Sequence, residues 1–233
     1  MSFSANMRRI LQDIYKRLFA TFGRQYWWPG ETPFEVMVGA LLTQNTAWTN
    51  AARAISRLKE KDLLDSAKLA RLPHRRLAQL IRSSGYFNQK ARRLKGFVQY
   101  LQRNYQGEVA RMRDLALDQL RAELLSLSGI GPETADSILL YALEKPVFVV
   151  DAYTRRVLAR HSLIPWDASY EEIQTLLMQN LPQDVALFNE YHALFVAVGK
   201  SLCQKRYPQC HRCPLRAVGL LRLEASSRPG TPL

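Results

Sequence analysis

Apolar side chains recur at helical spacing in four separate stretches of the chain, and no other feature constrains the fold as strongly. Within each stretch they stand three or four positions apart, which places them on one face of a helix. The stretches cover residues 11–22, 94–101, 135–142 and 187–198. Proline and glycine interrupt the sequence between them, and no strand-rich segment stands out. The sequence therefore predicts an all-α fold, with the short apolar run 147–150 as a buried extended connection.

The composition favours a globular protein that binds a polyanion. The 233 residues are 47% hydrophobic, which is too apolar for a disordered chain. No apolar run approaches the roughly 20 residues that cross a bilayer, and the first residues lack a signal-peptide core, so we expect a cytoplasmic protein without a membrane partner. The net charge is +13, with basic residues spread along the chain. Nucleic acid is the usual partner of so basic a domain, although a basic surface kept for solubility is the alternative.

The turn Gly129-Ile130-Gly131 lies between two predicted helices, residues 120–127 and 134–143. Two glycines permit a tight turn and let a ligand approach the backbone closely. Pro132 suits the first turn of a helix, where its missing N–H costs little. Such a turn exposes backbone N–H groups to a phosphate without reading the base sequence. An ordinary connection between two helices is the alternative, because Gly-x-Gly alone is a weak signal.

Asp151 follows the turn by 20 residues, directly after the apolar run. A carboxylate beside a bound DNA strand stabilises the positive charge that builds on a sugar when its N-glycosidic bond breaks. Asp151 is also a good N-cap for the helix predicted to follow it. The two roles are compatible.

Several segments together resemble the helix-hairpin-helix DNA glycosylases of the endonuclease III superfamily. Besides the turn and Asp151, residues 33–35 and 41–46 are similar to that family's first core helix and the loop after it, and residues 84–91 to its Gly-x-x-Asn-x-Lys-Ala segment. The resemblance spans about residues 30 to 215. It implies two helical lobes with a DNA-binding cleft between them. We expect one lobe at 27–145, the other at 1–26 plus 146–219, and a flexible tail at 220–233.

The resemblance also implies roles for individual residues. Asp151 takes the place of the family's catalytic aspartate, and a monovalent cation is expected at the hairpin. Either Gln44 or Asn45 would fill the gap that a flipped base leaves in the duplex. The DNA-binding residues expected on this basis are Gln44, Asn45, Asn88, Lys90, Gly129, Ile130, Gly131 and Thr134.

Glu133 is the main departure from the family. Endonuclease III has a lysine two residues after the second hairpin glycine, and this amine attacks the sugar to form a Schiff base. A carboxylate cannot form an imine, so the departure predicts a monofunctional glycosylase that uses water. Lys200 is a second lysine of interest, although a solvated side chain is at least as plausible for it.

The aromatic residues near the first core helix resemble the 3-methyladenine DNA glycosylase III branch, in which such residues sandwich the extruded base. An alkylated purine carries positive charge, and stacking on an indole gives about 0.5–2 kcal/mol of cation–π attraction. Packing in the core is the alternative, since it is the usual fate of tryptophan. The predicted base pocket consists of Trp27, Trp28, Pro29, Trp48 and Lys200.

The three cysteines, Cys203, Cys210 and Cys213, reproduce the first three ligands of the family's iron–sulfur loop. The fourth ligand would fall at Gly219, where cysteine is missing. A [4Fe–4S] cluster wants four ligands, so a cluster, a zinc site and a loop without metal all remain open.

Taken together, these features predict a monofunctional DNA glycosylase of base excision repair. It would act as a monomer on double-stranded DNA that contains a damaged base, in the cytoplasm and associated with the nucleoid. Three alternatives remain: an endonuclease III-like glycosylase and lyase for oxidised pyrimidines, an adenine-mismatch glycosylase, and a non-catalytic helix-hairpin-helix module. The adenine-mismatch enzyme would carry a glutamate general acid near Ala40, and the sequence has none there.

Overall fold

The structure is a computed structural model that describes residues 3–218. Every regular element in that range is a helix, which confirms the predicted all-α class. The chain packs into two compact units: unit 1 comprises residues 1–27 and 148–233, and unit 2 comprises residues 28–147. The predicted tail at 220–233 and the position Gly219 lie outside the described residues. No helix in the described range is long and apolar enough to span a membrane.

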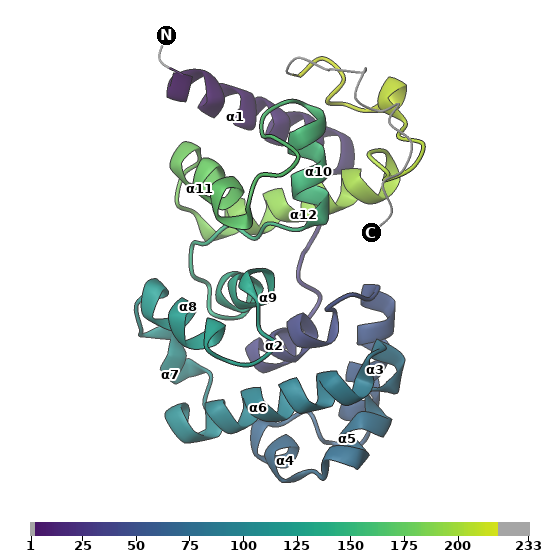
Figure 1. Cartoon of the computed structure of the whole chain (residues 1–233), viewed down its shortest axis with the longest axis vertical. Helices are drawn as coiled ribbons and strands as arrows, with labels where there is room; N and C mark the ends of the chain where they lie inside the picture. Colours follow the sequence, from purple (N-terminus) through teal and green to yellow (C-terminus); the bar gives the residue numbers. More distant parts are fainter. Residues whose placement is uncertain (1–2, 219–233) are drawn as a thin grey trace. The chain divides into compact units, whose positions relative to one another are not determined.

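Unit 2 is built around the long helix α6, which packs against α2, α4 and α5 (Figure 1). Leu94, Phe97 and Leu101 of α6 are at most 1% exposed, as their helical spacing predicts. The elements of unit 2 are α2 (Pro33–Leu42), α3 (Trp48–Glu60), α4 (Ser66–Arg71), α5 (His74–Leu80), η1 (Arg82–Ser84), α6 (Phe87–Tyr105), α7 (Ala110–Arg113), α8 (Leu117–Leu125), α9 (Pro132–Ser137) and the π-helical turn η2 (Ile138–Ala142).

The helices around the hairpin differ in detail from the predicted ones. The first, α8, ends at Leu125, so the turn begins two residues earlier than expected. The second begins at Pro132, whose ring takes the first helical position, and it widens after Ser137 into a π-helical turn. There the Leu143 N–H donates to the carbonyl of Ile138, five residues back.

Unit 1 packs α12 between α1 and α10. Its core is aromatic: Tyr191 and Phe195 of α12 stack at 4.7 Å between ring centroids, and Phe148 meets both edge-on. The Tyr191 hydroxyl donates to the Leu11 carbonyl on α1 at 2.8 Å. The elements of unit 1 are α1 (Phe3–Phe22), α10 (Ala152–Arg160), α11 (Tyr170–Asn180), α12 (Val185–Ser201) and η3 (Cys210–Arg212).

The apolar run 147–150 is the buried extended connection that its length predicts. Hydrogen bonds from α11 fix its backbone: Gln174 Nε2 donates to the Phe148 carbonyl at 2.7 Å, and the Val150 N–H donates to the Tyr170 hydroxyl at 3.3 Å. Because α11 holds the connection at two points, the residue that follows it, Asp151, starts α10 from a fixed position.

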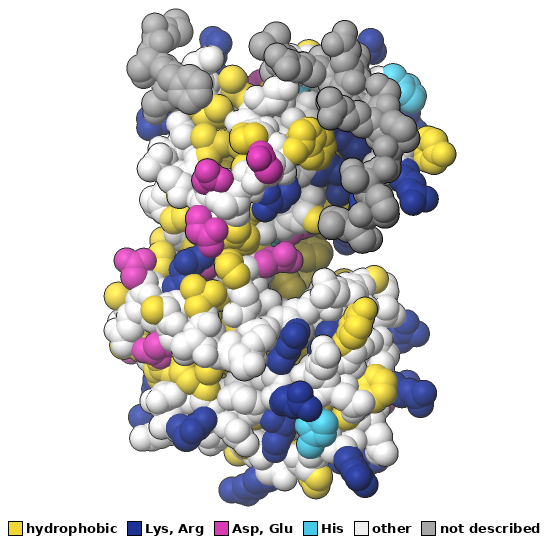
Figure 2. Space-filling view, in the orientation of Figure 1, with side chains coloured by type: hydrophobic (Ala, Val, Ile, Leu, Met, Phe, Trp, Pro, Cys, Tyr) yellow, Lys and Arg dark blue, Asp and Glu magenta, His cyan; other side chains and the backbone are white. Residues whose placement is uncertain are grey.

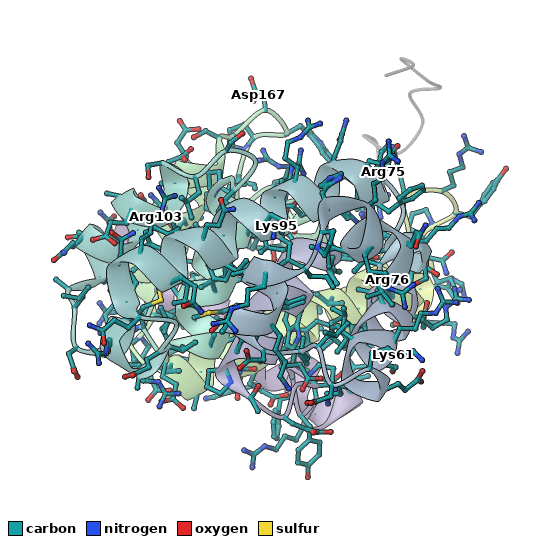
Figure 3. All side chains as sticks on the ribbon, turned by 90° about the horizontal axis from the view of Figure 1, so that it is seen from below. Lys61, Arg75, Arg76, Lys95, Arg103 and Asp167 are labelled. Carbon is teal, nitrogen blue, oxygen red and sulfur yellow. The ribbon has the colours of Figure 1, made fainter. Side chains whose placement is uncertain are left out.

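Basic side chains are scattered over the surface of unit 2 (Figures 2 and 3). Arg75 and Arg76 lie exposed on α5, and Lys61 and Arg103 are exposed near the ends of α3 and α6. Lys95 has a different role, because its ammonium donates to the carbonyls of Leu69, Ala70 and Leu72 at the end of α4.

Candidate active site and DNA-binding hairpin

The hairpin turn depends on one left-handed glycine. Gly129 has φ +83°, and a Cβ added there would lie 2.3 Å from Nε of Arg93. Only glycine fits this conformation and this close approach. Gly131, in contrast, has φ −94°, and an added Cβ would meet no atom within 4 Å. The space beside Gly131 is therefore open to a ligand, as a phosphate-binding turn requires.

Helix α9 begins at Gly131 without a side-chain cap. The N–H groups of a first helical turn have no partner within the helix, and the helix dipole makes this end favourable for anions. The geometry suits a phosphate at this turn.

Ile130 does not offer its N–H to a ligand, which corrects the expectation for this residue. The Ile130 N–H donates to the Leu127 carbonyl at 3.0 Å, and the side chain is only 5% exposed. Ile130 holds the turn together from inside, and a ligand is left with the two glycines that flank it.

Gln44 braces the hairpin, a role that sequence analysis missed. Its Nε2 donates to the Gly129 carbonyl at 3.0 Å and to Thr134 Oγ1 at 2.9 Å, while its Oε1 accepts from Arg93 at 2.6 Å. The amide is fully engaged within unit 2, so it is not free to fill a gap in DNA. Thr134 is likewise occupied through its hydroxyl and is 8% exposed.

Lys90 is the clearest correction among the predicted DNA contacts. Its side chain is 2% exposed, and its ammonium donates to the carbonyls of Leu42 at 2.8 Å and Ser84 at 2.6 Å. Burial, together with the charge of Arg93, lowers the Lys90 pKa to about 8. The lysine ties the start of α6 to the end of α2 and cannot reach a DNA backbone from there.

Asp151 is the N-cap of α10. Its Oδ1 accepts a hydrogen bond from the Thr154 N–H at 2.7 Å, so the capping role is met. Its Oδ2 lies 3.6 Å from Nε2 of His192 on α12, a distance typical of an ion pair and too long for a good hydrogen bond. The two side chains are 12% and 6% exposed, respectively.

The environment of Asp151 keeps its carboxylate ionised. Burial is the largest single influence on the Asp151 pKa and raises it, but the attraction of His192 and the hydrogen bonds at the start of α10 together outweigh burial. The net result is a pKa below the ordinary aspartate value. A buried carboxylate that stays charged at neutral pH provides a fixed negative charge for a cationic reacting group.

His192 is a residue that sequence reasoning missed. It lies on α12 between Tyr191 and Ala193, in a helix that is buried along most of its length, where a lone histidine is usually a core residue. Nothing in the sequence links it to Asp151, 41 residues away. Only the packing of α12 against α10 brings the two together.

Three aromatic rings form a cluster in unit 2. Trp28 meets Trp48 edge-on at 5.2 Å and lies 5.3 Å from Tyr141 of the π-helical turn. Gly39 of α2 lets both indoles approach, because an added Cβ would lie 3.1 Å from Trp28 and 3.3 Å from Trp48. The rings are half-buried, so the cluster combines packing with an accessible aromatic surface. The sequence did not indicate Tyr141 as a member.

Trp27 belongs to unit 1, where the Lys200 ammonium lies 5.8 Å from its ring centroid. This distance allows a cation–π contact. Lys200 itself is exposed at the end of α12. Pro29, Asn45 and Asn88 are also exposed, and their roles in binding a base or DNA stay predictions.

The cysteines do not provide a metal centre in the part of the chain that the structure describes. All three line a cavity of about 20 Å³, which is room for roughly one water molecule. Arg160 lies on the same cavity and donates to Cys203 Sγ at 3.2 Å. The three thiols are one short of the four ligands that a [4Fe–4S] cluster takes. The described residues therefore do not fit a [4Fe–4S] cluster.

Arginines hold the cysteine loop in its place. Arg156 donates to the carbonyls of Cys203 at 2.7 Å and Gly199 at 2.9 Å, and Arg160 donates to the carbonyls of Gln204 and Lys205. The monovalent cation expected at the hairpin stays a prediction.

Comparison with known proteins agrees with this geometry. The pattern of the HhH-GPD superfamily of base excision DNA repair proteins matches residues 38–183, more than half of the chain. The chain belongs to this superfamily. It is a DNA glycosylase of base excision repair with the endonuclease III fold.

Relatives span nearly the whole chain. A protein of Methanocaldococcus jannaschii described as a DNA repair glycosylase is 46% identical over 213 residues, which cover 91% of this chain and 96% of the relative. Endonuclease III of Bacillus subtilis is 29% identical and covers 80% of each chain.

Two solved structures are informative. Endonuclease III trapped as a covalent intermediate with DNA has a TM-score of 0.78 and 27% identity, and covers 94% of this chain and 96% of its own. The H. pylori 3-methyladenine DNA glycosylase bound to 1,N6-ethenoadenine has a TM-score of 0.67 and 28% identity. The match covers 84% of this chain and 97% of the H. pylori chain. The chain thus resembles both an enzyme trapped covalently on DNA and an enzyme bound to 1,N6-ethenoadenine.

Proposed function

We propose that this DNA glycosylase is monofunctional and releases an alkylated purine such as 3-methyladenine from double-stranded DNA by hydrolysis. The observation that carries the proposal is Glu133, which follows the second hairpin glycine at the position where endonuclease III has its lysine. Glu133 is exposed in the first turn of α9. Because a carboxylate cannot form an imine with the sugar, water remains the nucleophile.

Two lysines are candidates to replace the missing amine. The lowered pKa of Lys90, about 8, would suit imine formation, but its ammonium is enclosed by two carbonyls and is not accessible. Lys200 is exposed beside Trp27, and a charged ammonium over an indole is a poor nucleophile. Lys200 is therefore the residue to test, and we expect it to support binding rather than attack.

Asp151 supports the reaction through its charge. With a pKa below the ordinary aspartate value, its carboxylate is a weak base and removes a proton from water inefficiently. It is well suited to stabilise the cation that develops on the sugar as the base departs. An alkylated purine also makes the glycosidic bond easier to break, because its positive charge makes it a good leaving group.

The aromatic side chains favour an electron-poor base as the substrate. The Trp28–Trp48–Tyr141 cluster offers an accessible aromatic surface, and such surfaces hold flipped bases by stacking. A cationic base gains additional attraction there. The H. pylori 3-methyladenine glycosylase with which the chain shares its fold supports this choice of substrate. We expect a monomer that remains with chromosomal DNA in the nucleoid.

Base release separates the candidate activities. The full chain is incubated with methylated duplex DNA and with oxidised duplex DNA, and the free bases are identified. We expect 3-methyladenine from the first substrate, no oxidised pyrimidine from the second, and no adduct after borohydride reduction. Release of pyrimidines with trapping by borohydride would refute the proposal. A Glu133→Lys variant is the matched control, since trapping that appears only in this variant shows that the assay detects an amine at this position.

An endonuclease III-like lyase acting on oxidised pyrimidines is the second candidate. It is favoured by the higher TM-score to endonuclease III, 0.78 against 0.67 for the alkylpurine enzyme. If Lys200 supplied an amine for this activity, trapping would occur with the wild-type protein and would vanish in Lys200→Met.

A further inference from the structure

A cavity of about 440 Å³ lies between the second half of α6 and α8, within unit 2. Its volume falls in the range of small-molecule sites, about 300–1,000 Å³. Gln119, Glu123 and Ser126 come from the first hairpin helix and its C-cap, but no lining residue belongs to the glycine turn 129–131, the aromatic cluster or the Asp151 site. The lining residues are Tyr100, Asn104, Tyr105, Leu115, Gln119, Glu123 and Ser126.

A carboxylate is the charged group of this cavity. Glu123 Oε2 accepts hydrogen bonds from the hydroxyls of Tyr100 at 2.6 Å and Tyr105 at 2.5 Å, and Oε1 accepts from Gln119 at 3.0 Å. Both tyrosines are only 6% exposed, so the phenols are fixed in place. Two donors on one oxygen define a rigid, oriented anion.

The Glu123 carboxylate is charged and lacks a cation. Hydrogen bonds from Tyr100 and Tyr105 lower the Glu123 pKa, while burial raises the pKa of both phenols, so the proton stays on the tyrosines. Among the described residues, no lysine or arginine forms an ion pair with Glu123. A half-buried charge without a counterion is costly unless a ligand supplies one.

The α7–α8 side of the cavity is acidic, in contrast to a chain with a net charge of +13, whereas α6 carries the exposed Arg103 next to Asn104. Residues 108–144 contain seven acidic and three basic residues. All three basic residues are already paired: Arg111 with Glu108, Arg113 with Glu144 and Arg121 with Asp136. Figure 2 shows acidic side chains along the edge of unit 2 formed by α7 and α8. The carboxylates next to the cavity attract cations.

We propose that the cavity binds an alkylammonium or guanidinium group, with Glu123 as its counterion. The amide oxygens of Asn104 and Gln119 and the hydroxyl of Ser126 are the acceptors available for the remaining N–H groups. The group comes either from a free polyamine or from a lysine or arginine side chain of a partner protein. The site is separate from the proposed base-release chemistry and does not depend on it.

Calorimetric titration of the full chain tests the proposal. Agmatine and spermidine serve as free amines, and a blocked tri-arginine peptide serves as the side-chain source. We expect at least one probe to bind, and Glu123→Gln, which keeps the shape and removes the charge, to weaken binding tenfold or more. Binding of agmatine or spermidine assigns the free amine as the source, and binding of the peptide alone assigns a partner side chain.

The matched control is Asp118→Asn, which removes one exposed negative charge from the same helix outside the cavity. Binding should change by less than twofold in this variant. Equal loss in Glu123→Gln and Asp118→Asn would show a general electrostatic attraction and overturn the proposal, as would the absence of binding by every probe. Should Glu123→Gln fail to fold, Asn104→Trp fills the mouth of the cavity and is expected to abolish binding while base release persists.

Discussion

Two helix starts in this glycosylase show opposite solutions to the same problem. Helix α9 begins at Gly131 without a side-chain cap, and helix α10 begins at Asp151, whose carboxylate caps it. Every helix start has N–H groups that need partners. In α9 no side chain caps the helix, and we propose that a DNA phosphate binds there. In α10 the chain supplies its own anion, and the second oxygen of that carboxylate faces His192. The comparison teaches that an uncapped start leaves room for a phosphate, whereas a capped start holds a charged carboxylate in a fixed position.

The largest expected effect comes from Asp151→Asn, which separates the two roles of this cap. Asparagine still caps a helix, so at neutral pH the free energy of unfolding should fall by no more than about 1 kcal/mol. The negative charge is lost, and the rate of base release should fall by about 10²- to 10³-fold or more. Single-turnover release from methylated DNA measures the rate, and DNA binding by gel shift is the control. A rate within tenfold of wild type would mean that capping is the only role of Asp151.

The uncapped start is tested by the pair Gly129→Ala and Gly131→Ala. Gly129→Ala forces alanine into φ +83° and against Arg93, so the free energy of unfolding should fall by about 1–3 kcal/mol. Gly131→Ala meets no atom within 4 Å, so its stability should stay equal or rise by up to about 1 kcal/mol. Its DNA affinity should nevertheless fall, because the methyl group occupies the space where a phosphate approaches. If the DNA affinity of Gly131→Ala were unchanged, the proposal that a phosphate binds beside Gly131 would be wrong.

The variant Gln44→Ala tests whether the Gln44 side chain stabilises the uncapped start of α9. The hydrogen bonds to Gly129, Thr134 and Arg93 disappear, and we expect a loss of about 1–2 kcal/mol in the free energy of unfolding. Base release by the folded fraction should remain close to wild type. Asn45→Gly is the neighbouring control, because it removes an exposed side chain at φ +51° without backbone strain. A large loss of base release at full stability in Gln44→Ala would restore the gap-filling role.

The smallest expected effect is on how the free energy of unfolding depends on pH through Asp151 at the start of α10. The Asp151 pKa is lower in the folded chain than in an unfolded one, so its stabilisation is present above the ordinary aspartate pKa and is lost as pH falls through the folded value. Urea unfolding of wild type and Asp151→Asn should therefore converge as the solution is acidified. His192→Gln removes one cause of the lowered Asp151 pKa. The stabilisation by Asp151 should then begin to be lost at a higher pH, and the free energy of unfolding should change by on the order of 1 kcal/mol or less. Parallel pH curves for all three proteins would show that His192 does not act on Asp151.

Much of the fold was determined by the sequence, because the signals are local. Apolar spacing identifies the helices, and the residues that it assigns to buried faces, such as Leu94 and Leu101, are buried. The glycine turn and Pro132 define the hairpin within one or two residues, since left-handed backbone and a first-turn proline depend on neighbouring atoms only. Asp151 as a helix cap follows from the same local chemistry.

The tertiary structure decided which side chains are available. Gln44 and Lys90 have the types and positions of DNA-binding residues, yet their polar groups bond to partners 85 and 48 positions away in the chain. His192 and Tyr141 gain their importance from helices that pack against Asp151 and Trp28. The physical reason is that a hydrogen bond or ion pair between distant segments depends on where packing places their backbones. The sequence alone specifies the chemical groups, and only the fold determines which of them remain free to meet a ligand.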